Sequence, residues 1–207
     1  MKPILAEGKT NERACTQEVL AGATVFYVEN ASTYFSAGNH IFVSTSGGTA
    51  VEYAGVAQTV TTTTVTVDEG VIGAKGSGAK IWKPTAYYQF YYTESGNEEG
   101  KDLGIDNVQS GGGTLWKSKL RDTTERVRLE WSIYPASAYD AMMTFIEDTL
   151  NDGLDDATLA WKDKYAGVRT ARVKVVTNEW TRGVHSGSWL RKVALEAQVA
   201  GWNEYAT

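Results

Sequence analysis

The two histidines, His40 and His185, are the first residues to consider for catalysis. Imidazole changes its charge near neutral pH and often serves as a general acid or base. His40 lies in the apolar run HIFVS and His185 in the glycine- and serine-rich sequence GVHSG, and neither has a nucleophile or carboxylate placed beside it by the sequence. We therefore expect both histidines to be structural or exposed, and we expect the protein not to be an enzyme.

Three other groups could bind a phosphate or a metal. Residues 73–80, GAKGSGAK, resemble a phosphate-binding loop, but an alanine precedes Lys80, no serine or threonine follows, and the strand-like IWKP stands where a helix is needed. The acidic pairs at 98–99 and 155–156 lack the spacing of a calcium loop and suit solvated turns. Cys15 is alone, so it forms neither an internal disulfide nor a thiolate zinc site. We expect no catalytic residue, no cofactor and no metal.

Composition indicates a soluble globular protein. Of 207 residues, 42% are hydrophobic and 22% are charged. The net charge is −5, and basic residues are interspersed with acidic ones, so a footprint for nucleic acid is missing. No run of about 18 apolar residues predicts a membrane span, and the N-terminus does not resemble a secretory signal. The 11 Tyr and 7 Trp suit either protein interfaces or ordinary β-sheets.

Residues 24–84 are predicted to form a small β-barrel or sandwich, preceded by an N-terminal arm at 1–23. Six short β-prone runs alternate with Gly, Asn or Ser in this stretch, which is typical of a compact all-β module. Pro84 is expected to close the module, because proline cannot donate to a sheet ladder. The positions expected to face the core, from their period of two, are Val25, Tyr27, Ile41, Val43, Val65 and Val67.

The second unit, residues 85–207, opens with the aromatic run TAYYQFYYT. Aromatic residues occupy both faces of this predicted strand, so one face needs a cover from outside its own core. The following segment, 94–113, is rich in Gly and acids and suggests a long loop that orders against a neighbouring subunit, or else plain surface disorder. The candidate subunit interface consists of Tyr87, Tyr88, Phe90, Tyr91, Tyr92, Leu103, Ile105 and Val108.

Beyond this segment the patterns are clearer. Residues 126–134, RVRLEWSIY, alternate in polarity and predict a half-buried strand. A helix is predicted over about 136–151, starting near Pro135 with a capping box from Ser137 and Asp140, and stopping at Gly153. Further strands follow it, so the unit is predicted to be an α+β sandwich with one flanking helix. The apolar stripe of the helix is Tyr139, Met142, Met143, Ile146 and Leu150.

From Arg126 onward these features resemble, in order, the distal-tail and lambda minor-tail M family of tailed phages, and the likeness extends over about 86–202. The features are the strand RLEWSIYP, the helix SAYDAMMTFIEDTLNDG, the short strand TLAWKDK, the segment RTARVKVVTNEW and the closing strand LRKVALEAQV. The family's helix usually ends at a glycine pair, whereas here only Gly153 stands there, and Trp161 takes the position of its tryptophan. The predicted barrel at 24–84 departs from shorter family members.

The resemblance implies a mainly β, tail-tube-like sandwich and a structural role in the virion tail. Subunits of that family form closed rings, usually hexamers, that join the tail tube to the tip or hub proteins. It further implies assembly in the host cytoplasm, a 94–113 arm on the next subunit, no contact with a membrane, and a lumen through which DNA passes without specific binding. The alternatives are a tube or terminator subunit, a carbohydrate-binding or host-adhesion module, and, third, a tail-associated hydrolase.

Overall fold

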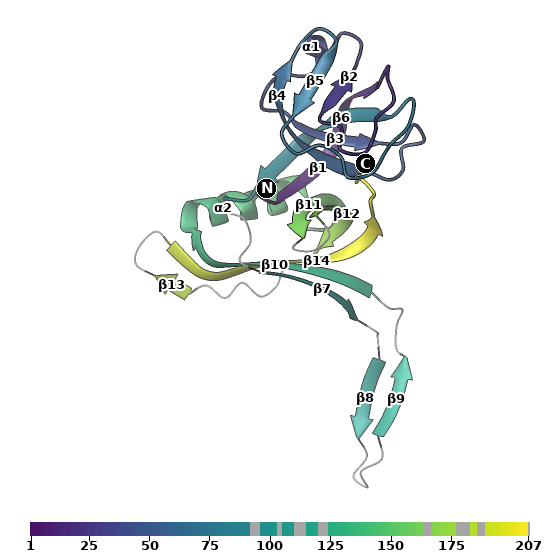
Figure 1. The fold of residues 1–207 in the computed structure, drawn as a ribbon. Coiled ribbons are helices and arrows are strands. Elements are labelled where there is room, and N and C mark those ends of the chain that lie inside the picture. Colours follow the sequence, from purple (N-terminus) through teal and green to yellow (C-terminus); the bar gives the residue numbers. More distant parts are fainter. Residues whose placement is uncertain are drawn as a thin grey trace.

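The computed structural model describes residues 1–91, 96–102, 105–109, 115–119, 124–163, 167–176, 183–185 and 189–206. Within these residues the protein is mainly β, as predicted, with a large antiparallel sheet and one longer helical segment (Figure 1). The predicted sandwich is compatible with this architecture. No helix in this part of the chain is both long and apolar enough to cross a membrane.

Twelve strands of the described chain form one sheet, and two more form a separate pair. The order across the large sheet is β2-β5-β4-β3-β6-β1-β11-β12-β14-β10-β7, with β13 paired to β14. The elements are β1 (Ile4–Ala14), β2 (Val25–Tyr27), α1 (Ala31–Tyr34), β3 (His40–Ser44), β4 (Glu52–Val60), β5 (Thr64–Val67), β6 (Lys80–Gln89), β7 (Gly96–Asp102), β8 (Ile105–Gln109), β9 (Leu115–Lys119), β10 (Thr124–Pro135), α2 (Ala136–Thr144), the π-helix η1 (Phe145–Thr149), β11 (Ala157–Asp163), β12 (Gly167–Val175), β13 (Gly183–His185) and β14 (Trp189–Trp202).

Strand β1 corrects the expectation of an N-terminal arm at 1–23. It lies between β6 and β11 in the middle of the sheet, pairing antiparallel with both. The apolar residues at its start, Ile4, Leu5 and Ala6, are fully buried, because both faces of the sheet are covered there. Leu5 packs into one core cluster while Ile4 and Ala6 pack into another, as the alternation of a strand requires.

The core of the N-terminal half confirms four of the six predicted positions. Ile41, Val43, Val65 and Val67 are buried, whereas Val25 and Tyr27 are exposed at 36% and 39%. Phe26 is buried instead. The run TVFYV carries apolar residues on both faces, so its periodicity does not decide which face turns inward. In the three-residue strand β2 the large Phe26 ring takes the core side.

Strand β6 runs through the predicted boundary at Pro84. The residue pairs Lys83–Thr10 and Ala86–Glu7 flank the Pro84–Lys9 pair, so the strand continues despite the missing donor. The AKIWK run and the aromatic run are therefore one strand. As a result, β1 and β6 carry the same sheet from the N-terminal half into the C-terminal half (Figure 1).

The helix of the C-terminal half matches the predicted range. Met142, Ile146 and Leu150 of the predicted stripe are buried, and Tyr139 and Met143 pack against the same core. The last turn is a π-helix, which is followed by three consecutive residues with positive φ, ending at Gly153 (φ 79°). The predicted capping box is absent, because Pro135 is the N-cap and makes no side-chain capping hydrogen bond.

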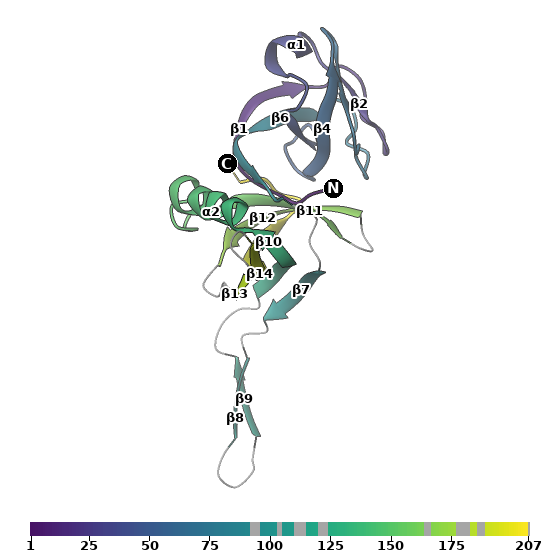
Figure 2. The ribbon, with the colours of Figure 1, turned by 90° about the vertical axis from the view of Figure 1, so that its left-hand side faces the viewer.

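The segment 94–113, expected as a loop, contains strands in its described part. Strand β7 pairs with β10 at the outer edge of the sheet. Strands β8 and β9 form a hairpin of their own, which projects away from the large sheet in both views (Figures 1 and 2). The segment is rich in Gly and acidic residues and has few apolar ones, so its sequence shows no period of two that would predict strands.

A third hydrophobic cluster joins the two halves of the molecule. Tyr205, near the C-terminus, contacts the rings of Phe42 and Trp82 at centroid distances of 4.9 and 5.3 Å. The backbone N–H of Tyr53 donates to Oγ1 of Thr170 at 3.0 Å, across β4 and β12. The cluster comprises Ile4, Ala6, Phe42, Val51, Tyr53, Trp82, Ala160 and Tyr205. The N-terminal and C-terminal halves therefore share a core.

Candidate functional site

A cleft of about 420 Å³ opens where β3 separates from β6. Strand β3 pairs with β6 only from Lys80 to Trp82, so the segment before Phe42 diverges from the segment after Trp82. Strand β1, which pairs with the other edge of β6, contributes Thr10 and Asn11 to the lining. The residues that line the cleft are Thr10, Asn11, Asn39, His40, Lys83, Pro84, Thr85 and Tyr87.

A bulge in β1 places Asn11 at the cleft. The pairing with β6 shifts register between Thr10 and Arg13, and Asn11 adopts a left-handed conformation with φ 56°. Bulges of this kind change the direction of a side chain relative to the regular strand. The Asn11 amide nitrogen donates to the carbonyl of Tyr34 at 2.8 Å, and the Arg13 guanidinium lies 3.6 Å from the centre of the Tyr34 ring. These contacts hold the bulged residues against α1.

His40 lines the cleft and is only 4% exposed. Its Nδ1 lies 2.7 Å from the hydroxyl oxygen of Tyr53, and its ring meets the Tyr87 ring edge-on at 4.4 Å. Burial lowers the pKa of His40 to about 4, although the charge of Asp68 acts in the opposite direction. Burial also raises the pKa of Tyr53. Both groups are therefore neutral at pH 7, and the Tyr53 hydroxyl can donate to Nδ1.

The two histidines lie on different strands, β3 and β13. His40 is a buried strand residue bonded to Tyr53, which agrees with a structural role, and the backbone of His185 belongs to β13. The cleft could not be recognised from the sequence, because its residues come from β1, from β6 and from the start of β3, and they carry no motif. The only local signal was the Gly38-Asn39 turn just before His40.

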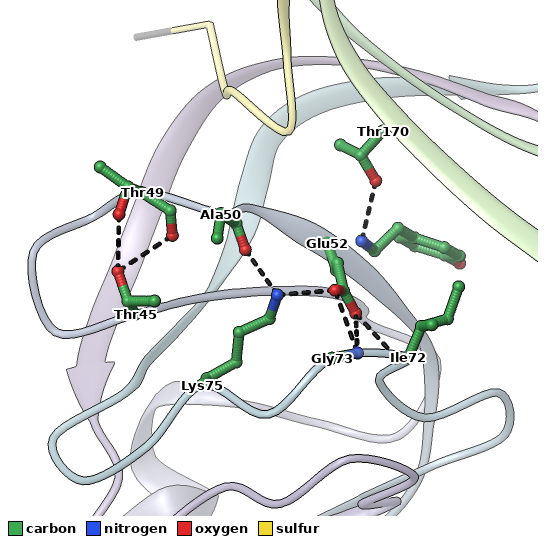
Figure 3. Close-up of polar contacts among 9 residues, drawn as sticks. Thr45, Thr49, Ala50, Glu52, Ile72, Gly73, Lys75 and Thr170 are labelled. Carbon is green, nitrogen blue, oxygen red and sulfur yellow. Dashed lines mark hydrogen bonds and ion pairs between the residues drawn. The ribbon is translucent and has the colours of Figure 1, made fainter.

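The glycine-rich stretch 73–80 holds its lysines in ion pairs. Nζ of Lys75 contacts Oε1 of Glu52 at 2.7 Å and the carbonyl of Ala50 at 2.6 Å (Figure 3). The same carboxylate accepts the backbone N–H groups of Ile72 and Gly73. Lys80 pairs with Glu12 at 3.0 Å. Because Glu52 accepts Lys75 and the loop's N–H groups, the stretch is a structural loop and does not present a phosphate cradle.

The acidic pairs also differ from metal sites. Glu98 and Glu99 lie on β7, paired with β10, so the expectation of a turn is wrong for them. Asp156 accepts Arg172 at 2.8 Å and lies 3.8 Å from Lys174. In the portion of the chain that the structure describes, no three His, Cys, Asp or Glu side chains gather closely enough to hold a metal.

The structure divides the candidate interface residues into distinct environments. Tyr87 and Tyr91 are about half exposed, at 48% and 49%. The Tyr88 hydroxyl lies 2.9 Å from that of Tyr134 and donates to a backbone carbonyl of α2. Phe90 is fully buried and stacked on a core tryptophan, so the expectation that it belongs to a subunit interface is wrong.

The remaining four candidates lie on the segment after β6. Ile105 and Val108 belong to β8, whose backbone alone is described, and Tyr92 and Leu103 lie outside the described residues. Their assignment to an interface therefore stays a prediction.

Comparison of the sequence with models of known protein families gives no match. Comparison with curated proteins also gives none.

Proposed function

We propose that the protein is a structural subunit of a tailed-phage virion, forming a ring at the distal end of the tail that joins the tail tube to the tip. The order of elements supports this proposal. Strand β10, the helix α2 with η1, β11 with the buried Trp161, β12 and β14 follow the order in which the resembling features occur along the sequence. In this proposal the protein has no catalytic role.

The observation that carries the proposal is the β8–β9 hairpin. Among the described strands it pairs only within itself, and it stands away from the large sheet (Figure 2). A closed ring with head-to-tail contacts needs two different surfaces on each subunit, one that contacts the next subunit and one that is contacted by the previous subunit. The hairpin is suited to reach the next subunit, and the half-exposed Tyr91 is a candidate for the receiving surface.

The same proposal includes a small barrel in the N-terminal half and a tail-tube-like sandwich in the C-terminal half. The isolated bridge between Cys15 and Val28 brings the end of β1 beside the end of β2, which supports a small closed barrel in the N-terminal half. The C-terminal half then corresponds to a tail-tube-like sandwich. A net charge of −5 suits a lumen that repels phosphate and lets DNA pass without specific binding.

Light scattering of the purified protein over a range of concentrations and salt levels tests this proposal. We expect a discrete closed oligomer, with six copies as the expected number, and rings in electron micrographs. A variant in which 103–120 is replaced by a Gly-Asn turn should be monomeric but folded, since the hairpin pairs with none of the other described strands. Growing filaments would favour a tube subunit instead. A protein that is monomeric under all conditions would contradict self-assembly and favour the adhesion-module alternative.

A further inference from the structure

We propose that the cleft between β1, β3 and β6 is a binding site for a neutral sugar residue. The site stands on the cleft geometry alone and is independent of the ring. The cleft has an exposed aromatic face, the ring of Tyr87. Tyr87 contacts His40 edge-on, yet 48% of its surface remains exposed. A fixed aromatic ring at the mouth of a polar cleft offers an apolar platform against which the C–H face of a sugar can pack.

The second argument is a set of polar groups that are held in place but not fully used. Oδ1 of Asn39 accepts the backbone N–H of Ser36 at 3.0 Å, and within the described residues its amide nitrogen has no partner. Asn11 has the complementary arrangement: its nitrogen is bonded to Tyr34, and no described group donates to its oxygen. One free amide donor and one free amide acceptor suit hydroxyl groups, each of which donates and accepts.

His40 adds a third polar group. Its Nδ1 is engaged by Tyr53, whereas Nε2 has no partner in the described part of the chain, although His40 lines the cleft. Nε2 is not among the fully buried atoms that lack a partner, so water reaches it in the cleft and it is available to bond a ligand. Because each of these three side chains is already fixed by one hydrogen bond, little side-chain entropy is lost when a ligand binds.

The charge of the cleft favours a neutral ligand over an anion. Lys83 is the only charged side chain among the residues that line it, and His40 is neutral at pH 7. Anion sites in proteins usually combine several cations or a row of backbone N–H groups. The half-exposed Tyr87 ring would contribute nothing to such a site. The volume of about 420 Å³ lies in the lower part of the range of small-molecule sites, ~300–1,000 Å³.

The test is a titration of the full chain with methyl glycosides of glucose, galactose, mannose and N-acetylglucosamine, followed by protein NMR. We expect saturable shifts with at least one glycoside, centred on Asn39, His40 and Tyr87. Replacing Tyr87 by Ala should weaken that binding about tenfold or more, because the platform is removed. Tyr27→Ala is the matched control, since Tyr27 is 39% exposed on β2 and does not line the cleft.

A second variant, Asn39→Ala, should also weaken binding, because it removes the free amide donor, and circular dichroism verifies that each variant is folded. Three outcomes would overturn the proposal: no glycoside shifts the cleft residues; inorganic phosphate saturates them while the glycosides do not, which makes the cleft an anion site; or Tyr87→Ala and Tyr27→Ala bind equally well. Failure of ring formation leaves the titration unaffected, because a monomer contains the whole cleft.

Discussion

At the residue scale, the contact between Glu52 and Lys75 shows how a charged pair stabilises a loop. The Lys75 side chain is only 2% exposed and that of Glu52 17%. The ammonium group contacts a carboxylate and a carbonyl, and the carboxylate also accepts two backbone N–H groups from the loop. The buried charges and the loop N–H groups are therefore hydrogen-bonded to one another. These bonds fix the 72–75 loop against the start of β4.

Substitution of Glu52 by Gln should lower the free energy of unfolding by about 3 kcal/mol, because Lys75 would stay buried without its counter-charge. Urea unfolding followed by tryptophan fluorescence measures the change. The matched control is Glu12→Gln, which removes the partner of the more exposed Lys9 and Lys80 and should cost at most about 1 kcal/mol. An equal loss in the two variants would contradict the account.

At the element scale, the bulge between β3 and β4 depends on one glycine. Ile41 pairs with Gly55 but Phe42 pairs with Tyr53, so Ala54 is the extra residue. Gly55 has φ 111°, and a Cβ atom there would lie 2.1 Å from a carboxylate oxygen of Asp68. The same oxygen accepts the N–H of Val56 at 2.7 Å. The absence of a side chain at 55 thus allows Asp68 to anchor the bulge.

Replacing Gly55 by Ala should destabilise the protein by about 2 kcal/mol or more, since the new methyl group meets Asp68 and the backbone is strained. Thermal or urea unfolding provides the measurement. Gly47→Ala is the control, because no atom lies within 4 Å of a Cβ at that position and its φ is not in the left-handed range. The explanation fails if the two substitutions have the same effect.

At the scale of the whole molecule, the third hydrophobic cluster joins two halves that the sequence predicts to be separate units. Tyr205 packs on Phe42 and Trp82 and donates from its hydroxyl to the carbonyl of Gly8 at 2.8 Å. Strands β1 and β6 are common to both halves. The two halves are therefore expected to unfold as one cooperative unit.

Near- and far-ultraviolet circular dichroism should report coincident unfolding transitions for the native protein. Tyr205→Ala should lower the free energy of unfolding by about 3 kcal/mol, a usual cost for deleting a large buried aromatic ring. The near- and far-ultraviolet transitions of this variant should no longer coincide. Tyr27→Ala, on an exposed site, should do neither. Two separate transitions in the unmodified protein would show that the halves are independent.

The features predicted correctly from the sequence are those encoded locally. The alternation over 126–134 and the stripe from Tyr139 to Leu150 each lie within one element, so their periodicity reveals the buried face. The positions of β1 and the cleft depend instead on distant partners. Ile4 pairs with Ala160, and the cleft combines residues of β1, β3 and β6. No local sequence pattern predicts contacts between residues so far apart in the chain. The face of β2 was missed because both of its faces carry apolar side chains.

The central place of β1 also governs how the protein can fold. Residues 4–14 leave the ribosome well before their two partner strands, because β6 begins only at Lys80 and β11 only at Ala157. Until β11 has been made, the apolar start of β1 lacks one neighbour and its edge is open to pairing with other chains. The contact between Ile4 and Ala160 closes one of the longest chain loops in the molecule. Folding is thus completed late, is slowed by loop closure, and benefits from protection of the nascent chain.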